Sequence, residues 1–518
     1  MLTEGEGAQD DSSPVSVLVY DAGAPGARRD FGPLARNSLR KLRTLRHPHI
    51  LRFLDGSEHG DAQQVYIVTE RVRPLWPMLD AKELKDEALV YGLLHVVSAL
   101  AFLNDEGAST HANIRPEAIF VTQGGDWRLG GFELCSRKDD PAAVLYTHAA
   151  AAMPDSKMLA SPEVRRDGWA SLKDYDAFVL DAFQLHLLIY TLFNGPLPPS
   201  FSTATDAAPP TLPPSARGSM PPPLHQASRR LGAPNPGARL STRAFLDLGT
   251  GAQSATGGWW STNRLVRLAA ALDNFALASA EERTALVRLL RDFDRQKGTP
   301  RALPEGFLLY KVLPSLVHTS EFGGGGPQLI PLVLSLASNL PEQEHDKAVV
   351  QPLVRMFASP DREMRMALLD GLDKFAGQLS AKDINERVWP HLATGFGDVV
   401  PVIREATIKA VPLLAPKLSE RTLNNDLLRV LAKTQSDPVP GIRTNTCILL
   451  GRIAKQLSPS TARKVLVPAF ARAVRDPFVH ARIAGLMALM ATIEIFERED
   501  LAGKVIPSMS ICLVDREK

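Results

Sequence analysis

The chain has 518 residues, of which 45% are apolar, and its 59 basic and 57 acidic side chains leave a formal charge of +2. A single hydrophobic core stops growing near ~250 to 300 residues, so we expect more than one domain. The near balance of charge excludes a whole-chain field that demands nucleic acid or an anionic membrane, and any such partner must be met by a local patch.

The three cysteines, Cys135, Cys447 and Cys512, are far apart and follow no metal-binding or disulfide spacing. This pattern argues against a zinc site and a disulfide framework and favours a reducing cytosolic compartment. The first residues, MLTEGEGAQDDSSP, are acidic and polar, unlike a signal peptide, and no apolar run approaches ~18 residues. We therefore expect no metal, no cofactor and no transmembrane segment.

The first half of the chain alternates β-rich runs with helical patterns, which predicts an α+β domain. Strands are predicted at 15–20 (VSVLVY) and 65–72 (VYIVTERV), a basic helix at 34–45, and a helix buried on more than one side at 88–103. The short runs 119–121 and 127–129 flank Gly124-Gly125-Asp126 and predict a hairpin.

Between residues 201 and 226 the composition changes to Pro, Ser, Ala and Thr. Such a segment has too little apolar area to order itself, which predicts a solvated loop inserted in the first domain. The alternative is a PxxP-type ligand for a partner domain.

The second half contains amphipathic helical patterns without strand signals, and one helix opens with a capping box at 279–282 (SAEE). Four arginines recur every 39 residues: Arg365, Arg404, Arg443 and Arg482. Six residues before the last three lies an aspartate: Asp398, Asp437 and Asp476. Such a turn Asp and helix Arg, in a repeat of this length, are typical of HEAT repeats.

Three apolar columns follow the same register, at i, i+3 and i+10, which we interpret as one helix face. The columns are Leu369, Ile408, Cys447 and Leu486; Leu372, Val411, Leu450 and Leu489; and Leu379, Leu418, Leu457 and Phe496. Four units in register predict an all-α solenoid. The Asp and Arg side chains are expected to form a ladder of turn hydrogen bonds between units, with a ligand-binding role as the alternative.

These patterns predict a domain at 1–250, a helical transition with first repeats at 251–345, and repeats of period 39 at 346–518. The next turn aspartate after Asp476 falls at Asp515, close to Lys518. The last repeat is therefore expected to lack its second helix, and the chain to be a fragment of a longer protein.

The stretch 111–121, HANIRPEAIFV, resembles the catalytic loop of a protein kinase. Asn113 stands where the catalytic Asp belongs, and Ala118 stands at the position of a metal-binding Asn. Further along, LGGFEL places Gly131 where the metal-binding Asp belongs. The ATP-contacting Lys falls at or beside Tyr20, and its helix Glu partner falls at Ser38.

Phosphoryl transfer needs these charged groups together, so their joint loss predicts a pseudokinase without catalytic, metal-binding or cofactor-binding residues. Positions that pack the kinase frame persist. They are His111, Phe132, the ASPE segment at 160–163, Asp181 at a helix start, and Asn235-Pro236 followed by Arg239. The Asp is expected to hold the catalytic-loop backbone, and the Arg to pair with Glu163.

The chain resembles the Scy-like family of N-terminal kinase-like proteins, on the segments PVSVLVYD, TLRHPHILRFLDG, WRLGGFE, FNGPLP, NPGAR, DPVPGIR and RDPFVHAR. The resemblance implies a pseudokinase domain followed by HEAT repeats and a scaffold role in coat protein I-dependent Golgi-to-ER vesicle traffic. It also implies an adaptor role in tRNA export from the nucleus. By this resemblance, we expect the chain to start too late for a full first strand and glycine loop, and to stop before the family's C-terminal tail, which carries coat-binding signals.

Three functions are open. The first is a cytosolic scaffold whose partners are coat protein I subunits, small GTPases or export factors. We expect it at Golgi or ER-Golgi intermediate membranes or at the nuclear pore periphery, with peripheral membrane association only. The second is a tRNA adaptor, with no role for DNA. Its candidate RNA- or partner-binding residues are Arg452, Lys455, Arg463, Lys464, Arg472, Arg475 and Arg482. The third is an unorthodox kinase.

Overall fold

The computed structural model describes residues 2–6, 14–25, 28–60, 63–147, 149–203, 212–213, 215–251, 257–299, 302–322 and 326–515. The chain divides into two compact units, Met1–Lys311 (unit 1) and Val312–Lys518 (unit 2). The finer predicted subdivision into 1–250, 251–345 and 346–518 stays a prediction. The two units are described separately below.

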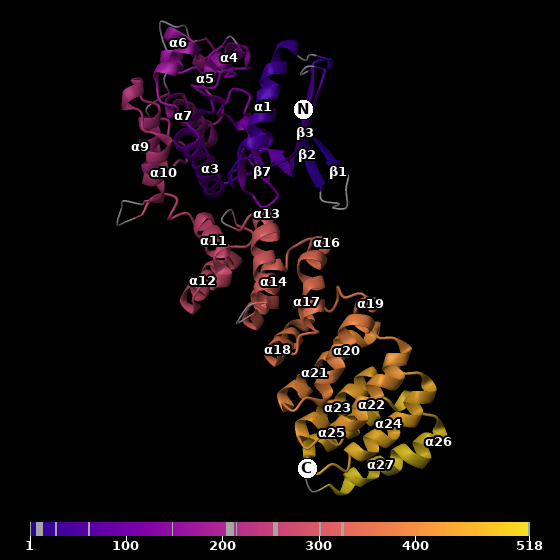
Figure 1. Cartoon of the computed structure of the whole chain (residues 1–518). Coiled ribbons are helices and arrows are strands. Elements are labelled where there is room, and N and C mark those ends of the chain that lie inside the picture. The colour runs from indigo at the N-terminus through magenta and orange to yellow at the C-terminus, as the bar shows by residue number, and fades with distance from the viewer. Residues whose placement is uncertain are drawn as a thin grey trace. The chain divides into compact units, whose positions relative to one another are not determined.

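Unit 1 begins with an antiparallel four-stranded sheet in the order β1-β2-β4-β3. Its strands are β1 (Leu2–Glu6), β2 (Pro14–Asp21), β3 (Phe53–His59) and β4 (Gln64–Glu70). Helix α1 (Gly32–Thr44) packs on this sheet, as Figure 1 shows. Its Leu39 and Leu42, three residues apart on one helix face, are at most 2% exposed in the main core, and Leu34 is 1% exposed in a second apolar cluster.

Two smaller sheets complete the β structure of the described part of unit 1, in the orders β5-β7-β8 and β6-β9. The strands are β5 (Val72–Pro74), β6 (Ser109–Thr110), β7 (Ile119–Thr122), β8 (Trp127–Leu129) and β9 (Ser136–Arg137). The β7–β8 hairpin confirms the prediction around Gly124-Gly125-Asp126, and Gly125 has a φ of +82°, which a turn needs.

The helices that follow form the larger part of unit 1. They are α2 (Leu75–Asp80), α3 (Asp86–Ala101), α4 (Ala149–Ala152), α5 (Ser156–Leu159), α6 (Pro162–Asp167), α7 (Phe178–Asn194), α8 (Ser200–Thr203), α9 (Pro222–Leu231), α10 (Thr242–Thr250), α11 (Arg264–Asp273), α12 (Ala280–Arg295) and α13 (Glu305–Phe307). Helix α12 carries the predicted capping box, with Ser279 and Glu282 bonded reciprocally.

Helix α3 is central to the core of unit 1 and continues as a π turn to Glu106. Among the described residues, this is the one helix that is long and apolar enough to cross a membrane, by length and composition only, and 67% of its apolar stretch is buried inside the protein. The prediction that this helix is buried on more than one side is confirmed, because the consecutive residues from Leu89 to Leu93 are all buried and successive residues of a helix point about 100° apart.

The structure corrects the predicted loop at 201–226. Helix α9 begins at Pro222, and its Leu224 is fully buried in the core. A proline in the first turn fits a helix, because the first N–H groups have no intrahelical partner. Residues 204–211 and 214 lie outside the described residues, so the prediction is left untested there.

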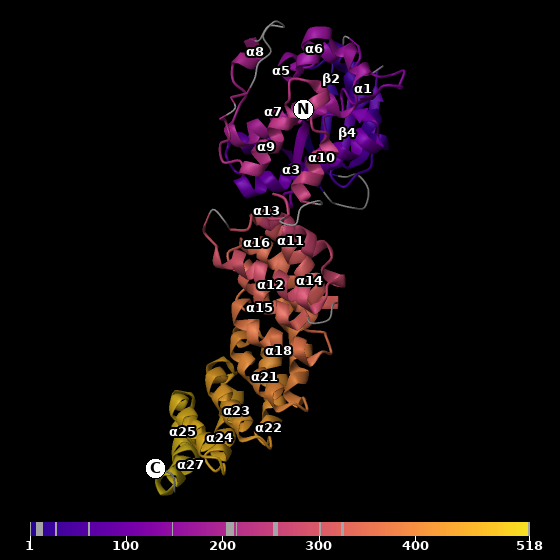
Figure 2. The ribbon, with the colours of Figure 1, turned by 90° about the vertical axis from the view of Figure 1, so that its left-hand side faces the viewer.

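Unit 2 is a stack of helices in two layers (Figure 2). Its helices are α14 (Leu313–Phe322), α15 (Ile330–Ala337), α16 (Glu342–His345), α17 (Gln351–Met356), α18 (Arg362–Gly371), α19 (Ala381–Asp383), α20 (Trp389–Leu392), α21 (Pro401–Leu414), α22 (Leu428–Thr434), α23 (Pro440–Ile453), α24 (Pro459–Ala473), α25 (Val479–Ala491), α26 (Arg498–Asp500) and α27 (Ile506–Ser510). The second helices of successive repeats, α18, α21, α23 and α25, pack side by side, and the helical solenoid is confirmed.

The predicted apolar columns are buried, with Leu486 half-buried as the exception. The interpretation of all three as one helix face is wrong for the third column. Leu418, Leu457 and Phe496 lie at the end of a 3₁₀ turn after each second helix, in extended backbone. Ten residues are close to three full turns of a helix, so periodicity alone could not show that the helix had already ended.

Candidate functional site

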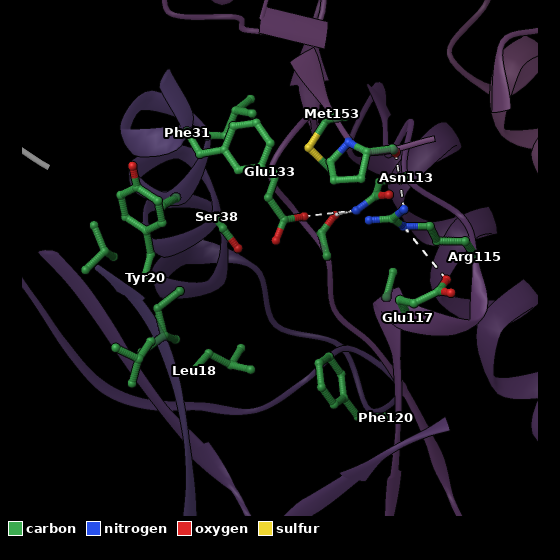
Figure 3. Close-up of a pocket in the computed structure, with 18 residues that line it drawn as sticks. Leu18, Tyr20, Phe31, Ser38, Asn113, Arg115, Glu117, Phe120, Glu133 and Met153 are labelled. Carbon is green, nitrogen blue, oxygen red and sulfur yellow. Dashed lines mark hydrogen bonds and ion pairs between the residues drawn. The ribbon is translucent and has the colours of Figure 1, made fainter. Parts of the chain in front are cut away.

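A cleft of about 310 Å³ lies in unit 1 between the four-stranded sheet, helix α1 and the 111–121 loop (Figure 3). All five positions that the sequence identifies as altered kinase positions line this cleft: Tyr20, Ser38, Asn113, Ala118 and Gly131. The remaining lining residues are Leu18, Val19, Phe31, Leu34, Ala35, Val65, Ile67, Arg115, Glu117, Phe120, Glu133, Met153 and Pro154. The structure therefore brings together the five altered positions, of which Tyr20 and Gly131 are 111 residues apart in the sequence.

Strand β2 supplies Leu18, Val19 and Tyr20 to the cleft, and Leu18 and Tyr20 share one face of the strand because alternate residues point to the same side. The Tyr20 hydroxyl donates a hydrogen bond of 2.9 Å to the carbonyl oxygen of Arg28. Across from this strand, α1 contributes Ser38, which is 4% exposed. Neither element places a Lys or a Glu in the cleft, and the positions predicted for the Lys–Glu pair that holds ATP phosphates in a kinase carry the neutral side chains of Tyr20 and Ser38.

The two predicted metal-ligand positions, Ala118 and Gly131, are small residues that pack against each other. Gly131 has a φ of +71°, and a Cβ atom built there would lie 2.5 Å from the Ala118 Cβ. A Cβ at the preceding Gly130 would lie 2.6 Å from the Phe120 ring. The paired glycines of LGGFEL are thus required by close packing, and a side chain at either position would force its neighbours apart.

Asn113, at the predicted catalytic-base position, donates hydrogen bonds to two acceptors. Its Nδ2 donates to the Glu133 Oε2 at 3.0 Å and to the Gly131 carbonyl at 3.2 Å. Burial raises the pKa of Glu133, against the opposing effects of its own backbone, the Arg115 charge and the Asn113 hydrogen bond. An amide cannot accept a proton at neutral pH, so this side chain ties two segments together and offers no general base.

Arg115 is the one cation that lines the cleft in the described part of the chain, and it is held at the rim. Its Nη1 donates to the Pro154 carbonyl at 3.2 Å and to Asp155 at 3.3 Å, and its Nε lies 4.0 Å from Glu117. These contacts direct its charge toward its own acidic neighbours.

The frame around the cleft has the contacts that the sequence predicts. His111 is fully buried, its Nε2 donates to the Gly130 carbonyl at 2.8 Å, and its ring packs edge-on against Phe132. Burial lowers the pKa of His111 to about 4, which keeps it neutral. The Asp181 carboxylate accepts from the backbone N–H groups of His111 and Ala112, both at 2.8 Å. Ala112 has a φ of +64°, so these bonds hold a strained loop.

A second predicted contact joins α6 to the segment before α10. Glu163 and Arg239 form a fully buried bidentate ion pair with N–O distances of 2.6 and 2.7 Å. The guanidinium also donates to the carbonyl oxygens of Ala233 and Val179. Because both charges are fully hydrogen-bonded, the pair can persist in the interior.

Unit 2 contains the predicted ladder. Each repeat arginine forms two hydrogen bonds, between 2.5 and 2.9 Å, with the turn aspartate 33 residues later: Arg404 with Asp437, Arg443 with Asp476, and Arg482 with Asp515. Each also donates to the carbonyl of its own turn aspartate six residues earlier. Asp398 accepts a single bond of 3.2 Å from Arg365, the first repeat arginine, and two bonds from Arg362 at 3.2 and 3.4 Å. The structural interpretation of these residues is confirmed.

The candidate basic residues do not form one patch. Arg463 pairs with Glu497, Arg472 donates to Gln435, and Arg482 belongs to the ladder. Arg463 and Arg472 are nine residues apart on α24, about 13 Å along the axis. Arg452, Lys455 and Lys464 are exposed at the turn between α23 and α24, while Arg472 and Arg475 are at the other end of α24.

Within the described ranges, no group of three or more His, Cys, Asp or Glu side chains could hold a metal ion. Cys135 and Cys447 are buried, and burial raises the pKa of each thiol to about 12. Both therefore pack as small apolar residues.

No protein-family model matches the chain. Over 406 residues it is 32% identical to the "probable inactive serine/threonine-protein kinase scy1" of Dictyostelium discoideum, a match that covers 78% of the chain and 45% of that protein. The chain belongs to the Scy-like family of kinase-like proteins. It is also 26% identical over 423 residues to "Cytoplasmic export protein 1" of Saccharomyces cerevisiae, covering 77% of the chain and 48% of that protein.

The fold is also similar to that in a crystal structure of Cex1p, with a TM-score of 0.65 and 24% sequence identity. The match covers 100% of the present chain and 90% of the Cex1p chain. This likeness concerns the fold, and it agrees with a kinase-like domain followed by a helical solenoid. The chain spans about half the length of the curated relatives it matches.

Proposed function

We propose that the chain is a non-catalytic scaffold in which a kinase-like unit and HEAT-type repeats present surfaces to partners in intracellular transport. The observation that supports this most is the cleft of unit 1. The groups that phosphoryl transfer requires are replaced there at five positions that converge on one space: Tyr20, Ser38, Asn113, Ala118 and Gly131.

The size of the loss supports the proposal. Removing a general base costs about 10²- to 10⁴-fold in rate. Metal ions neutralise the charge that develops on the transferred phosphoryl group, and neither metal-ligand position here carries an oxygen ligand. At Gly131 a side chain has no room beside Ala118. Phosphoryl transfer by the kinase route is therefore not expected.

What persists supports a platform. The Asp181 contacts and the Glu163–Arg239 pair shape the domain but do not touch a reacting group. A buried charge destabilises a protein unless it is fully paired and hydrogen-bonded. The presence of these complete networks therefore supports a role for the folded domain itself. The solenoid adds an extended surface of the kind that repeat proteins use for binding.

The partners we propose are coat protein I subunits, small GTPases and export factors, in the cytoplasm and at Golgi or ER-Golgi intermediate membranes, with vesicle traffic from Golgi to ER as the process. Membership of the Scy-like family supports this choice. The test is a pull-down from cytosol with the full chain. Recovery of coat subunits would support the proposal, and recovery of none of the three partner classes would contradict it.

An alternative is a cytoplasmic tRNA nuclear-export adaptor. The relative named "Cytoplasmic export protein 1" and the three exposed cations at the turn between α23 and α24, Arg452, Lys455 and Lys464, favour it. Three phosphate contacts would give a log–log salt slope of about −2 to −3. Binding of tRNA to the full chain over a salt series tests this, and Arg452→Gln/Lys455→Gln/Lys464→Gln should remove that slope.

A further inference from the structure

The unit 1 cleft remains a well-formed pocket although its phosphate-binding and metal-binding groups are replaced. Its volume of about 310 Å³ is at the lower end for small-molecule sites. The sheet contributes Leu18, Val65 and Ile67 as an apolar wall, and Phe120 and Met153 line the space from other segments. Such a space suits one flat aromatic molecule.

The charges facing this pocket exclude a polyphosphate. Glu133 and Glu117 line it, and the opposing cation Arg115 is engaged by Asp155 and the Pro154 carbonyl. In Figure 3 the Glu133 carboxylate lies in the space between the aromatic side chains and Asn113, with one oxygen bonded to that amide. The balance of the lining side chains is one positive charge against two negative ones. A nucleoside triphosphate would bring further negative charge to this surface without a Lys or a metal ligand to meet it.

We propose that this cleft binds a flat heteroaromatic cation without phosphate groups, with its ring against the apolar wall and its protonated nitrogen on the Glu133 carboxylate. The Glu133 carboxylate accepts from the Asn113 amide and interacts with its own backbone N–H, and within the described part of the chain no basic side chain forms an ion pair with it. Tyr20, Phe31 and Phe120 line the same space, and a cation near an aromatic face gains further attraction. A charge-assisted bond in this sheltered place is the source of selectivity.

The test compares two probes of the same shape on the full chain by calorimetry: 4-aminoquinoline, which is protonated at neutral pH, and 4-methylquinoline, which is not. A charged hydrogen bond contributes about 1.5 to 3 kcal/mol, so the cation should bind roughly tenfold or more tightly. Glu133→Gln should abolish this preference. Glu117→Gln is the matched control, because the Glu117 side chain is 47% exposed and its charge is screened by water, so it should change affinity less than about twofold.

A second variant covers the case in which Glu133→Gln does not fold. Leu18→Lys adds a cation to the apolar wall and should weaken the cationic probe while leaving the neutral one bound. Equal affinity of the two probes, equal effects of the two glutamate variants, or tighter binding of magnesium-ATP in competition would each overturn this inference. Binding of magnesium-ATP without phosphoryl transfer would leave the scaffold proposal standing, whereas transfer would contradict that proposal separately.

Discussion

The guanidinium of Arg443 donates two hydrogen bonds to the carboxylate of Asp476 in the next repeat, with Nε–Oδ2 and Nη2–Oδ1 distances of 2.7 and 2.8 Å. The same carboxylate oxygen Oδ1 accepts the backbone N–H of Phe478 at 2.8 Å. One side chain thus fixes the turn between α24 and α25 and joins two repeats. The stability of a solenoid depends on the interfaces between neighbouring repeats. We therefore expect this ion pair to stabilise the interface between its two repeats.

The first prediction concerns this pair. Asp476→Asn removes the charge and leaves one oxygen for three donors, which should destabilise the interface between α23 and α25 by about 1 to 3 kcal/mol. Hydrogen exchange of the α25 amides, measured by mass spectrometry, should become correspondingly faster. Lys504→Gln is the control, because it breaks an exposed i,i+4 pair with Asp500 and should cost no more than about 0.5 kcal/mol. Equal exchange in both variants would contradict a structural role for the ladder.

The second prediction is the acid sensitivity of unit 2. The Arg443 hydrogen bond lowers the pKa of Asp476, against the effect of burial. Burial by itself would raise the pKa of Asp437, but hydrogen bonds from Arg404 and the Val439 backbone hold it below its usual value. A carboxyl group whose pKa is lower in the folded state contributes stability above its unfolded pKa of about 3.9 and loses it as the pH falls further.

Far-UV circular dichroism during an acid titration measures this effect. The solenoid signal should be lost as the pH falls below about 4, and Asp437→Asn/Asp476→Asn should lose less stability over that range than the wild type does. The double variant starts from a lower stability at neutral pH, so the change with pH is the quantity to compare. An equal pH dependence would show that these carboxylates do not carry the effect.

The third prediction concerns the catalytic-base position. Asn113→Asp introduces the residue that we expect at this position in an active kinase, but it places a second carboxylate about 3.0 Å from Glu133 and removes the donor to the Gly131 carbonyl. We expect a loss of about 1 to 3 kcal/mol in the free energy of unfolding, seen as a lower Tm, and no gain of phosphoryl transfer. Glu133→Gln in the same chain should restore part of the Tm, because a glutamine amide can donate to the new carboxylate. A variant as stable as the wild type would contradict this contact.

The fourth prediction tests the buried pair of unit 1. Arg239→Lys keeps the charge but cannot make the two bonds to Glu163 together with those to Ala233 and Val179. Breaking a buried pair costs about 3 to 5 kcal/mol, so the variant should fold poorly or melt at a much lower temperature. Arg243→Gln, which affects an exposed pair with Asp105, should have little effect on the Tm.

Much of this structure could be predicted from local sequence, and the rest depends on distant contacts. The ladder follows from a strict interval, because a repeat places equivalent residues in equivalent positions. Strand β3 was missed, since FLDGSEH is polar, contains a glycine and lies mostly exposed at a sheet edge. The Asn113–Glu133 bond joins segments 20 residues apart, and no spacing rule predicts such a contact. The close packing of Gly131 on Ala118 explains the paired glycines only once the structure places them together.

The most direct measurement is the thermal stability of the full chain with and without magnesium-ATP, together with phosphate transfer from radiolabelled ATP. In the cleft, the position predicted for the ATP-binding Lys is occupied by Tyr20, and the positions predicted for the metal ligands are occupied by Ala118 and Gly131, whose side chains carry no oxygen. We therefore predict that magnesium-ATP does not change the Tm and that no protein becomes labelled at any magnesium concentration. A Tm that rises with magnesium-ATP concentration, accompanied by transfer that Glu133→Gln or Leu18→Lys abolishes, would contradict the proposal that this kinase-like unit is a non-catalytic platform.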